Sequence, residues 1–270
     1  MQYKLIISDY DGTFRHRDNT VGEKTLSAVK EYVRRGGKFV ICTGRMPSSI
    51  RPVLLRLGLD GVYVAYQGSI VAEVKSGKVL HESGFTKEQA LRICAAMRDM
   101  GLRIHAYDRD DCFVNYEDKD LLLYEDVCAI RSVRVPDAYD LIESSPNRFF
   151  KLLAMVKKEE RNAVRDALRE RLGEGEFYVS CSASTLVEVT AVGDTKGAAA
   201  AFLMSHYGVW KEEVLAFGDN QNDAPLLTAA GHGVAVANAD PSLKSVADEV
   251  SEKTCDEDAV GDYIEKFVLA

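Results

Sequence analysis

The chain has 270 residues, and its 34 lysines and arginines against 42 aspartates and glutamates give a formal net charge of −8. This length allows one large domain or two smaller ones at roughly 150 residues per domain. A composition of 46% hydrophobic and 28% charged residues is that of a globular protein, and the net acidity argues against nucleic-acid binding, which needs a basic face.

No segment has the composition of a membrane span or a secretion signal. The longest run without Asp, Glu, Lys or Arg, residues 224–239, contains Pro225 and two glycines. Residues 4–8 are too short for the apolar part of a signal peptide. The six cysteines are scattered without a C-x-x-C pair, so we expect reduced thiols in a cytoplasmic protein without a membrane partner.

The N-terminal part of the chain predicts a strand, a helix and a second strand. Residues 4–8 form an apolar run typical of a strand covered on both faces. Thr20 and Glu23 form a capping-box pattern that should begin a helix, which ends at Gly36-Gly37. A second apolar run, residues 39–42, follows directly, and this order indicates a parallel pair with a right-handed crossover.

The same alternation continues and returns near the C-terminus. A helix at 47–57 should kink or break at Pro52, and a third strand is expected at 62–65. The later elements expected are strands at 214–217 and 234–236 and helices at 224–230 and 258–267. The predicted fold class is therefore α/β, with a Rossmann-like parallel-sheet core.

The middle of the chain has a different pattern. Thr86 and Gln89 form a capping box for a helix that ends at Gly101. The other elements expected are strands at 103–107, 112–115, 149–156, 177–181 and 186–190 and a helix at 159–172. Helices followed by hairpins favour an α+β unit with an antiparallel sheet. We place this inserted cap domain at residues 82–190, and the discontinuous core at residues 1–81 and 191–270.

Polar groups follow the predicted core strands. Asp9 and Asp11 follow the first strand, Thr43-Gly44-Arg45 the second, and an acid and amide cluster at 218–223 the strand at 214–217, while Lys196 begins an alanine-rich helix. Ligands of an open parallel sheet bind beyond the carboxyl ends of its strands, so we expect these groups to meet. The pair at 9 and 11 alone could be a solvated turn, but an accidental turn does not predict the other groups.

This combination of residues is typical of phosphoryl transfer. Oxygen ligands with few carboxylates suit Mg²⁺, and no His or Cys pair has zinc spacing. A carboxylate can attack phosphorus to form an aspartyl phosphate, which a lysine, a hydroxyl and backbone amides would stabilise. A second acid must protonate the leaving oxygen and later accept a proton from water.

With these motifs the sequence resembles the haloacid dehalogenase superfamily, and most closely its Cof-type phosphatases with a large α/β cap. The four motifs occur in order as Asp9-Tyr10-Asp11-Gly12-Thr13, Thr43-Gly44-Arg45, Lys196-Gly197 and Gly218-Asp219-Asn220-Gln221-Asn222-Asp223. The resemblance covers essentially the whole chain, with the cap inserted between the second and third motifs.

The resemblance implies a role for each motif residue. Asp9 would be the nucleophile and a Mg²⁺ ligand, and Asp11 the general acid/base with its backbone carbonyl also on the metal. Asp219 would complete the metal site, and Asp223 would orient the Asp219 region. The phosphate would be held by the amides of Tyr10 and Gly44 and by Thr43, Lys196 and Asn222.

One departure from the family pattern concerns residues 67–69. The family often has Asn-Gly-Ala after its third strand, whereas this chain has Gln67-Gly68-Ser69, so no substrate contact is assigned there. Outside the motifs, Cys42 is expected to be a core thiol, and the five histidines show no paired spacing. Arg45 could contact substrate or pair with a neighbouring acid.

The function expected from the motifs and the resemblance is a Mg²⁺-dependent phosphatase that hydrolyses monoesters of small phosphorylated metabolites. Sugar phosphates are the first substrate class by resemblance, with phosphorylated flavin precursors or other cofactors as alternatives. A phosphomutase of the same chemistry and a non-catalytic phosphometabolite sensor are alternative functions. A phosphate-accepting receiver module would be less than half this length and would lack the cap.

Overall fold

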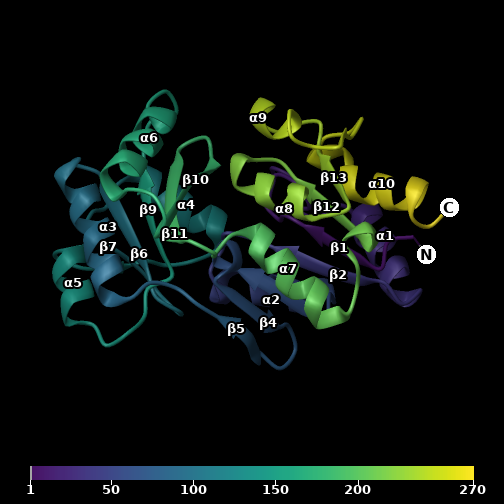
Figure 1. Cartoon of the computed structure of the whole chain (residues 1–270), viewed down its shortest axis with the longest axis horizontal. Coiled ribbons are helices and arrows are strands. Elements are labelled where there is room, and N and C mark those ends of the chain that lie inside the picture. Colours follow the sequence, from purple (N-terminus) through teal and green to yellow (C-terminus); the bar gives the residue numbers. More distant parts are fainter. Residues whose placement is uncertain (1) are drawn as a thin grey trace.

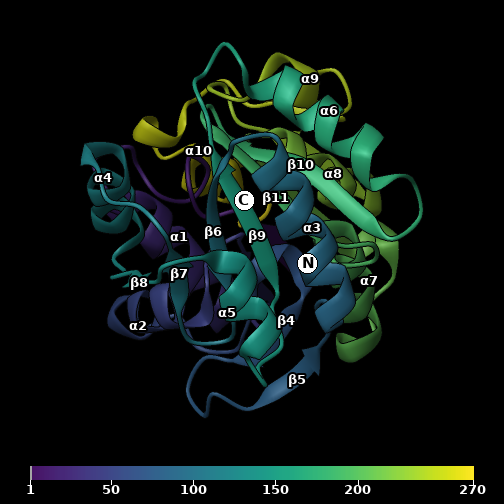
Figure 2. The ribbon, with the colours of Figure 1, turned by 90° about the vertical axis from the view of Figure 1, so that its left-hand side faces the viewer.

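The computed structural model describes residues 2–270, which form two β-sheets, each with its own helices (Figures 1 and 2). The larger sheet has the strand order β14-β13-β12-β1-β2-β3-β4-β5, and the smaller sheet has the order β10-β11-β9-β6-β7-β8. Figure 1 shows the two sheets in separate lobes, with both chain ends in the lobe of the larger sheet. Below, the larger sheet and its helices are named the core, and the smaller sheet and its helices the cap.

The core is a mainly parallel sheet between two layers of helices. Its strands are β1 (Leu5–Ser8), β2 (Lys38–Cys42), β3 (Val62–Ala65), β4 (Ile70–Glu73), β5 (Val79–Glu82), β12 (Val214–Gly218), β13 (His232–Ala235) and β14 (Glu249–Val250). Its helices are α1 (Glu23–Arg34), α2 (Pro47–Leu57), α7 (Lys196–Tyr207), α8 (Ala224–Ala229), α9 (Pro241–Lys244) and α10 (Ala259–Phe267). The pairs from β14 to β3 are parallel, while β4 and β5 add an antiparallel edge.

Alternating side chains of the central strand pack into the two helical layers. Ile6 lies in a cluster with residues of α1, α2 and α10, whereas Leu5 and Ile7 pack with residues of α7, α8 and α9. Burial on both faces explains why β1 is an unbroken apolar run. The parallel register pairs Ser8 with both Ile41 and Phe217, so β1, β2 and β12 end at the same edge of the sheet.

Three helices of the cap cover one face of its sheet, and a fourth packs against part of the other face. Its strands are β6 (Arg103–Tyr107), β7 (Cys112–Val114), β8 (Val133–Arg134), β9 (Lys151–Met155), β10 (Phe177–Ala183) and β11 (Leu186–Ala191). Its helices are α3 (Lys87–Asp99), α4 (Lys119–Cys128), α5 (Ala138–Ser144) and α6 (Arg161–Leu172). One face of the sheet packs against α3, α5 and α6 through Leu152, Ala154, Val187 and Val189. Side chains alternate along a strand, so the positions 151 and 188 lie on the opposite face of the sheet.

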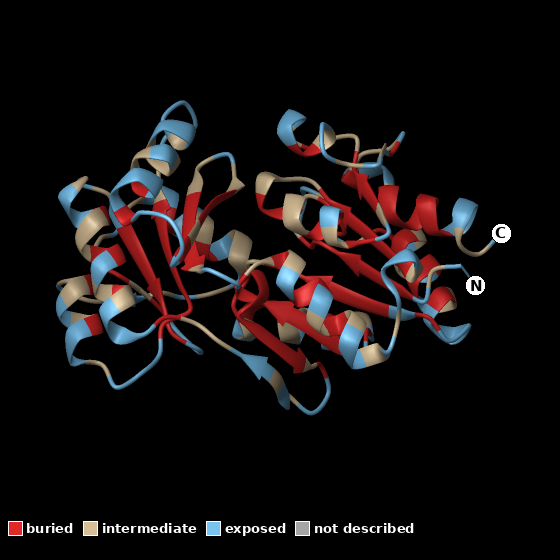
Figure 3. Cartoon of the chain, viewed as in Figure 1, coloured by how far each residue is buried: buried red, intermediate tan, exposed pale blue. Residues whose placement is uncertain are grey.

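The predicted fold class is confirmed, a parallel-sheet core with a second, mostly antiparallel sheet inserted in it. The capping box at Thr86 and Gln89 is present and begins α3. In Figure 3 the strands of both sheets are largely buried, whereas the outer turns of the helices are exposed. None of the helices formed by residues 2–270 has the length and hydropathy needed to cross a bilayer.

One local prediction in the core is wrong. The capping box at Thr20 does not form, because α1 has Gly22 as its N-cap and Thr20 donates to Asp18 instead. The carboxylate of Asp258 fills the space that a side chain at the N-cap position would need, since a Cβ on Gly22 would lie 1.7 Å from Asp258 Oδ1. The helix expected at 47–57 is present as α2 with these bounds, and it runs through Pro52 without a break, because burial of Ile50 and Leu54 compensates for the missing hydrogen bond.

Candidate active site

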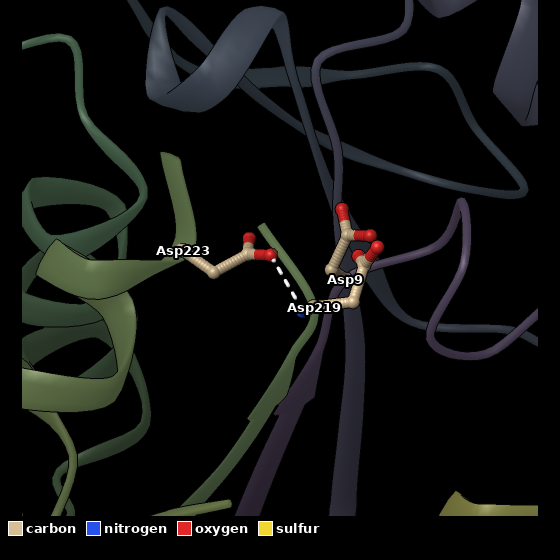
Figure 4. A group of neighbouring side chains, drawn as sticks. All are labelled: Asp9, Asp219 and Asp223. Carbon is tan, nitrogen blue, oxygen red and sulfur yellow. Dashed lines mark hydrogen bonds between the residues drawn. The ribbon is translucent and has the colours of Figure 1, made fainter. Parts of the chain in front are cut away.

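Three carboxylates meet at the carboxyl edge of the core sheet. Asp9 directly follows β1, Asp219 directly follows β12, and Asp223 lies in the short 3-10 helix η3 (Gln221–Asp223). One oxygen from each carboxylate lies within 4.8 Å of the others (Figure 4). Because β1 and β12 are parallel neighbours, two acids that are 210 positions apart in the sequence leave the sheet side by side.

A buried lysine lies between two of these acids. Lys196 is the first residue of α7, whose N-terminus is capped by the side chain of Thr195. Its Nζ donates to Asp9 Oδ1 and, at 2.5 Å, to Asp223 Oδ1. Burial by itself would lower the pKa of Lys196, but the charges of Asp223 and Asp9 outweigh burial and raise it well above its usual value. The lysine is therefore a fixed positive charge in the site.

Asp223 holds the loop that carries Asp219. Its Oδ2 accepts hydrogen bonds from the backbone N–H groups of Asp219 at 2.9 Å and Asn220 at 3.0 Å, while its Oδ1 accepts from Lys196. Figure 4 shows Asp223 directed at the backbone of Asp219, with the Asp219 carboxylate beside that of Asp9. Both Asp223 oxygens are thus occupied within the protein, which leaves Asp9 and Asp219 as the available acids.

The crowding of buried acids raises their pKa values. Burial, followed by the charges of Asp223 and Asp11, raises the pKa of Asp9 to about 7, although Lys196 opposes the shift. Burial and the charges of Asp9 and Asp223 raise the pKa of Asp219 well above its usual value. Such a pair is stabilised by a cation. The donors are all oxygens, so Asp9 and Asp219 fit a hard divalent ion such as Mg²⁺.

Asp11 lies at the wall of the site and is held by two arginines. Its carboxylate accepts from Arg45 Nε at 2.7 Å and Arg45 Nη2 at 2.8 Å, and it pairs with Arg15 at 2.6 Å. Its side chain is 37% exposed, against 8% for Asp9. Of the two alternatives for Arg45, the structure shows the pairing with a neighbouring acid.

The turn at Gly12 brings the first and fourth motifs together. Gly12 has a φ of +81°, and a Cβ there would lie 2.5 Å from Asp219 Oδ2. The next residue, Thr13, donates from its hydroxyl to Asp219 Oδ1 at 3.0 Å. A glycine at position 12 therefore provides both the positive φ and the space that Asp219 needs.

A cavity of about 440 Å³ lies over these groups, between the core and the cap. Of the residues predicted to hold phosphate, Thr43, Gly44 and Asn222 line it, together with Asp9, Asp11 and Asp219. Lys196 is fully buried behind Asp9. The side chain of Tyr10 is also buried, with the Arg45 guanidinium over its ring, so only its backbone amide is a candidate phosphate contact.

Sequence reasoning missed two charged cap residues on the face of the cap sheet that lines the cavity. Lys151 and Glu188 are each 3% exposed and form an ion pair of 3.3 Å. Lys151 Nζ also donates to the Gly44 carbonyl at 2.8 Å, which joins cap and core. Each is a charged residue within an apolar strand, in Phe149-Phe150-Lys151-Leu152-Leu153 and Leu186-Val187-Glu188-Val189. A charged residue within an apolar strand was the signal that could have identified this ion pair, because charges are rarely buried without a partner.

The residue that departs from the family pattern also joins cap and core. Gln67 lies in η1 (Tyr66–Gly68) with a φ of +62°, and it is buried. Its Nε2 donates to Glu188 Oε2 at 2.8 Å, and its Oε1 accepts from Asn222 Nδ2 at 3.0 Å. Gln67 therefore connects a cap acid to a predicted phosphate ligand.

Comparisons with known proteins agree on a single family. A sequence model of the haloacid dehalogenase-like hydrolases matches residues 6–264. The HMP-PP phosphatase of Escherichia fergusonii is 28% identical over 242 residues, which cover 90% of this chain and 87% of that protein. A haloacid dehalogenase-like hydrolase from B. subtilis has a TM-score of 0.89 at 23% identity, covering 98% of this chain and 100% of that one. A sugar phosphatase of subclass IIB has a TM-score of 0.83 at 22% identity, covering 99% and 100%.

Proposed function

This chain belongs to the haloacid dehalogenase-like hydrolases and is a phosphatase of that family, and on this basis we propose that it hydrolyses phosphate monoesters of small metabolites with the help of Mg²⁺. The observation that carries the proposal is the position of Lys196 between Asp9 and Asp223, with the carboxylate of Asp219 beside that of Asp9. The proposed nucleophile, a fixed cation and the proposed metal ligands thus lie under one cavity.

In the proposed reaction Asp9 is the nucleophile. Its Oδ1 is bound by Lys196, so Oδ2 is the oxygen that attacks phosphorus. The bond from phosphorus to the leaving oxygen breaks, and that oxygen takes a proton from Asp11, which leaves an aspartyl phosphate on Asp9. Asp11 then takes a proton from water, whose oxygen attacks phosphorus and releases inorganic phosphate and Asp9.

The charge on the transferred group is shared among fixed groups of the core. Lys196, the Thr43 hydroxyl, the Gly44 amide and the Asn222 amide would bind the phosphate oxygens. A Mg²⁺ ion held by Asp9, Asp219 and the Asp11 carbonyl would supply further positive charge next to them. The cap covers the cavity, so bulk water has limited access to the intermediate.

The lining of the cavity bears on the substrate class. Ser182 and Ser184 line the cavity with hydroxyl groups that can bond the hydroxyls of a ligand, and we therefore propose sugar phosphates as the first class. Tyr124, Ile130 and Leu186 line another part of the cavity and would cover an apolar face. For that reason the substrate named for the Escherichia fergusonii relative is a second candidate.

The test is phosphate release from a panel of sugar phosphates, nucleotides, flavin mononucleotide and HMP-PP, with and without Mg²⁺. Asp9→Asn should abolish turnover and keep the fold, whereas Asp60→Asn, an exposed residue paired with Lys75, should change neither. Retained activity in Asp9→Asn would remove Asp9 from its role. Turnover independent of divalent ions would contradict the metal, and dependence on an added bisphosphate would indicate a phosphomutase.

A further inference from the structure

The buried carboxylate of Glu188 is bound through both of its oxygens. Oε1 accepts from Ser182 Oγ at 2.6 Å and from Lys151 Nζ at 3.3 Å, both within the cap. Oε2 accepts from Gln67 Nε2 at 2.8 Å, across the boundary with the core. An ionised carboxylate can only accept hydrogen bonds, so it selects the NH₂ end of the Gln67 amide.

The orientation of the Gln67 amide in turn determines the orientation of the Asn222 amide. With its NH₂ group facing Glu188, Gln67 has its carbonyl oxygen facing Asn222, and that oxygen accepts from Asn222 Nδ2 at 3.0 Å. The NH₂ group of Asn222 keeps one further hydrogen, which is available to a phosphate oxygen. Among residues 2–270, Asn222 Oδ1 has no hydrogen-bond partner, so no other contact fixes which way this amide faces.

Gly44 lies next to the same ion pair of the cap, Lys151 and Glu188, and is bonded by Lys151. Its carbonyl accepts from Lys151, and a Cβ on Gly44 would lie 2.4 Å from Gln67 Nε2 and 3.4 Å from Glu188 Oε2. Gly44 therefore leaves the space through which Gln67 and Glu188 meet. Two of the five residues predicted to hold phosphate are therefore connected to the cap, Gly44 through Lys151 and Asn222 through Gln67 and Glu188.

We propose that Glu188 and Gln67 are positioning residues that form an amide relay, through which the cap sets the orientation of the Asn222 amide at the phosphate. The relay rests on the proposed function. The cap would then take part in assembling the phosphate site, in addition to covering the cavity.

Single substitutions should invert or break the relay. In Glu188→Gln the new carbonyl oxygen faces Lys151 and Ser182, so the new NH₂ group faces Gln67. Gln67 and then Asn222 must turn over, which presents the Asn222 carbonyl oxygen to the phosphate. In Gln67→Glu two carboxylates face each other. We expect each variant to lose about 10- to 100-fold in affinity for inorganic phosphate and in kcat/KM. This is the range observed when a residue that bonds and orients a metal ligand is replaced, and Gln67 orients Asn222 in the same way.

The exchange of the two residues provides the sharper test. In the double variant Gln67→Glu with Glu188→Gln, the carboxylate at 67 accepts from both the amide at 188 and Asn222. The Asn222 orientation is thereby restored, and phosphate affinity should return to within a few-fold of the wild type. A purely structural role for Glu188 predicts additive losses instead. Glu176→Gln, at an exposed cap residue paired with Arg92, is the matched control.

The measurement is calorimetric binding of inorganic phosphate to the full chain with Mg²⁺, alongside kcat/KM and the melting temperature. Unchanged phosphate affinity in both single variants, or additive losses in the double variant, would overturn the relay. If Glu188→Gln does not fold, the relay is tested by comparing the phosphate affinity of Gln67→Glu with that of the double variant. Failure of the wild type to release phosphate from any substrate refutes the proposed function, whereas an active wild type with unaffected variants refutes only the relay.

Discussion

Arg45 holds both carboxylate oxygens of Asp11, through Nε at 2.7 Å and Nη2 at 2.8 Å. The same guanidinium donates to the Val127 carbonyl at 2.8 Å, near the end of helix α4 in the cap. One side chain therefore connects the proposed general acid/base of the core with the cap. The position of Asp11 depends on how the two parts meet.

We predict that Arg45→Lys lowers kcat by about 10-fold, because an ammonium group cannot make the two-pronged contact, and that Arg45→Met lowers it further. Steady-state kinetics on the best substrate of the panel would measure this. Arg34→Lys is the matched control, since Arg34 makes the same two-pronged contact with Glu31 on the exposed surface of α1. Equal effects of Arg45→Lys and Arg34→Lys would contradict a role for Arg45 at the site.

Mg²⁺ binding should weaken as the pH falls below neutrality. Burial and neighbouring acids raise the pKa of metal-free Asp9 to about 7, so below that pH the carboxyl must lose a proton before it can bind the ion. We expect the dissociation constant to rise by up to about tenfold per pH unit below 7. Titration calorimetry between pH 6 and pH 8, in two buffers of different ionisation enthalpy, would also count the protons released. An affinity that is constant over this range would be inconsistent with the raised pKa.

Removal of the charge on Lys196 should affect the two proposed ligands in opposite directions. Lys196→Met leaves Asp9 and Asp223 without their cation, so Mg²⁺ should bind more tightly and inorganic phosphate more weakly. Loss of one group that stabilises the transition state costs about 10²- to 10³-fold in kcat, and we expect at least that. Binding of each ligand and turnover would be measured separately, with exposed Lys157→Met as the control. Parallel weakening of both ligands would indicate general disruption instead.

The cap contains a buried histidine that should make folding stability depend on pH. Burial, followed by the charge of Lys151, lowers the pKa of His105 to about 3. In the unfolded chain a histidine titrates near pH 6.5, so this stability is complete above about 6.5 and is lost as the pH falls toward 3, at up to about 1.4 kcal/mol per pH unit.

His105→Gln keeps a donor and an acceptor for Tyr116 and Tyr107 but cannot take up the proton. Its free energy of unfolding should therefore fall less between pH 7 and pH 4.5 than that of the wild type. Urea unfolding at several pH values would measure the difference, with His206→Gln at an exposed position as the control. Identical pH slopes for wild type and His105→Gln would show that His105 does not contribute.

Local patterns were sufficient for elements whose stabilising contacts are visible in the sequence. The apolar run of β1 and the capping box of α3 could be predicted because strand burial and N-capping involve neighbouring residues. Helices α4 and α5 and the antiparallel edge of β4 and β5 were not predicted. In α4 three consecutive leucines give no helical stripe: Leu121 is fully buried, in a cluster with Val114 and Leu153 of the cap sheet, whereas Leu122 and Leu123 are exposed. Such elements depend on contacts with distant parts of the chain.

The sequence by itself determined the fold class and which acids lie together, because acids placed directly after buried parallel strands must emerge at one edge of the sheet. Only the tertiary structure decided that Arg45 turns to Asp11, that Lys151 reaches the Gly44 carbonyl, and that Gln67 links Glu188 to Asn222. These contacts join the face of one sheet to the edge of another. Which side chains meet there depends on how the cap is seated on the core, and no local pattern of residues encodes that long-range packing.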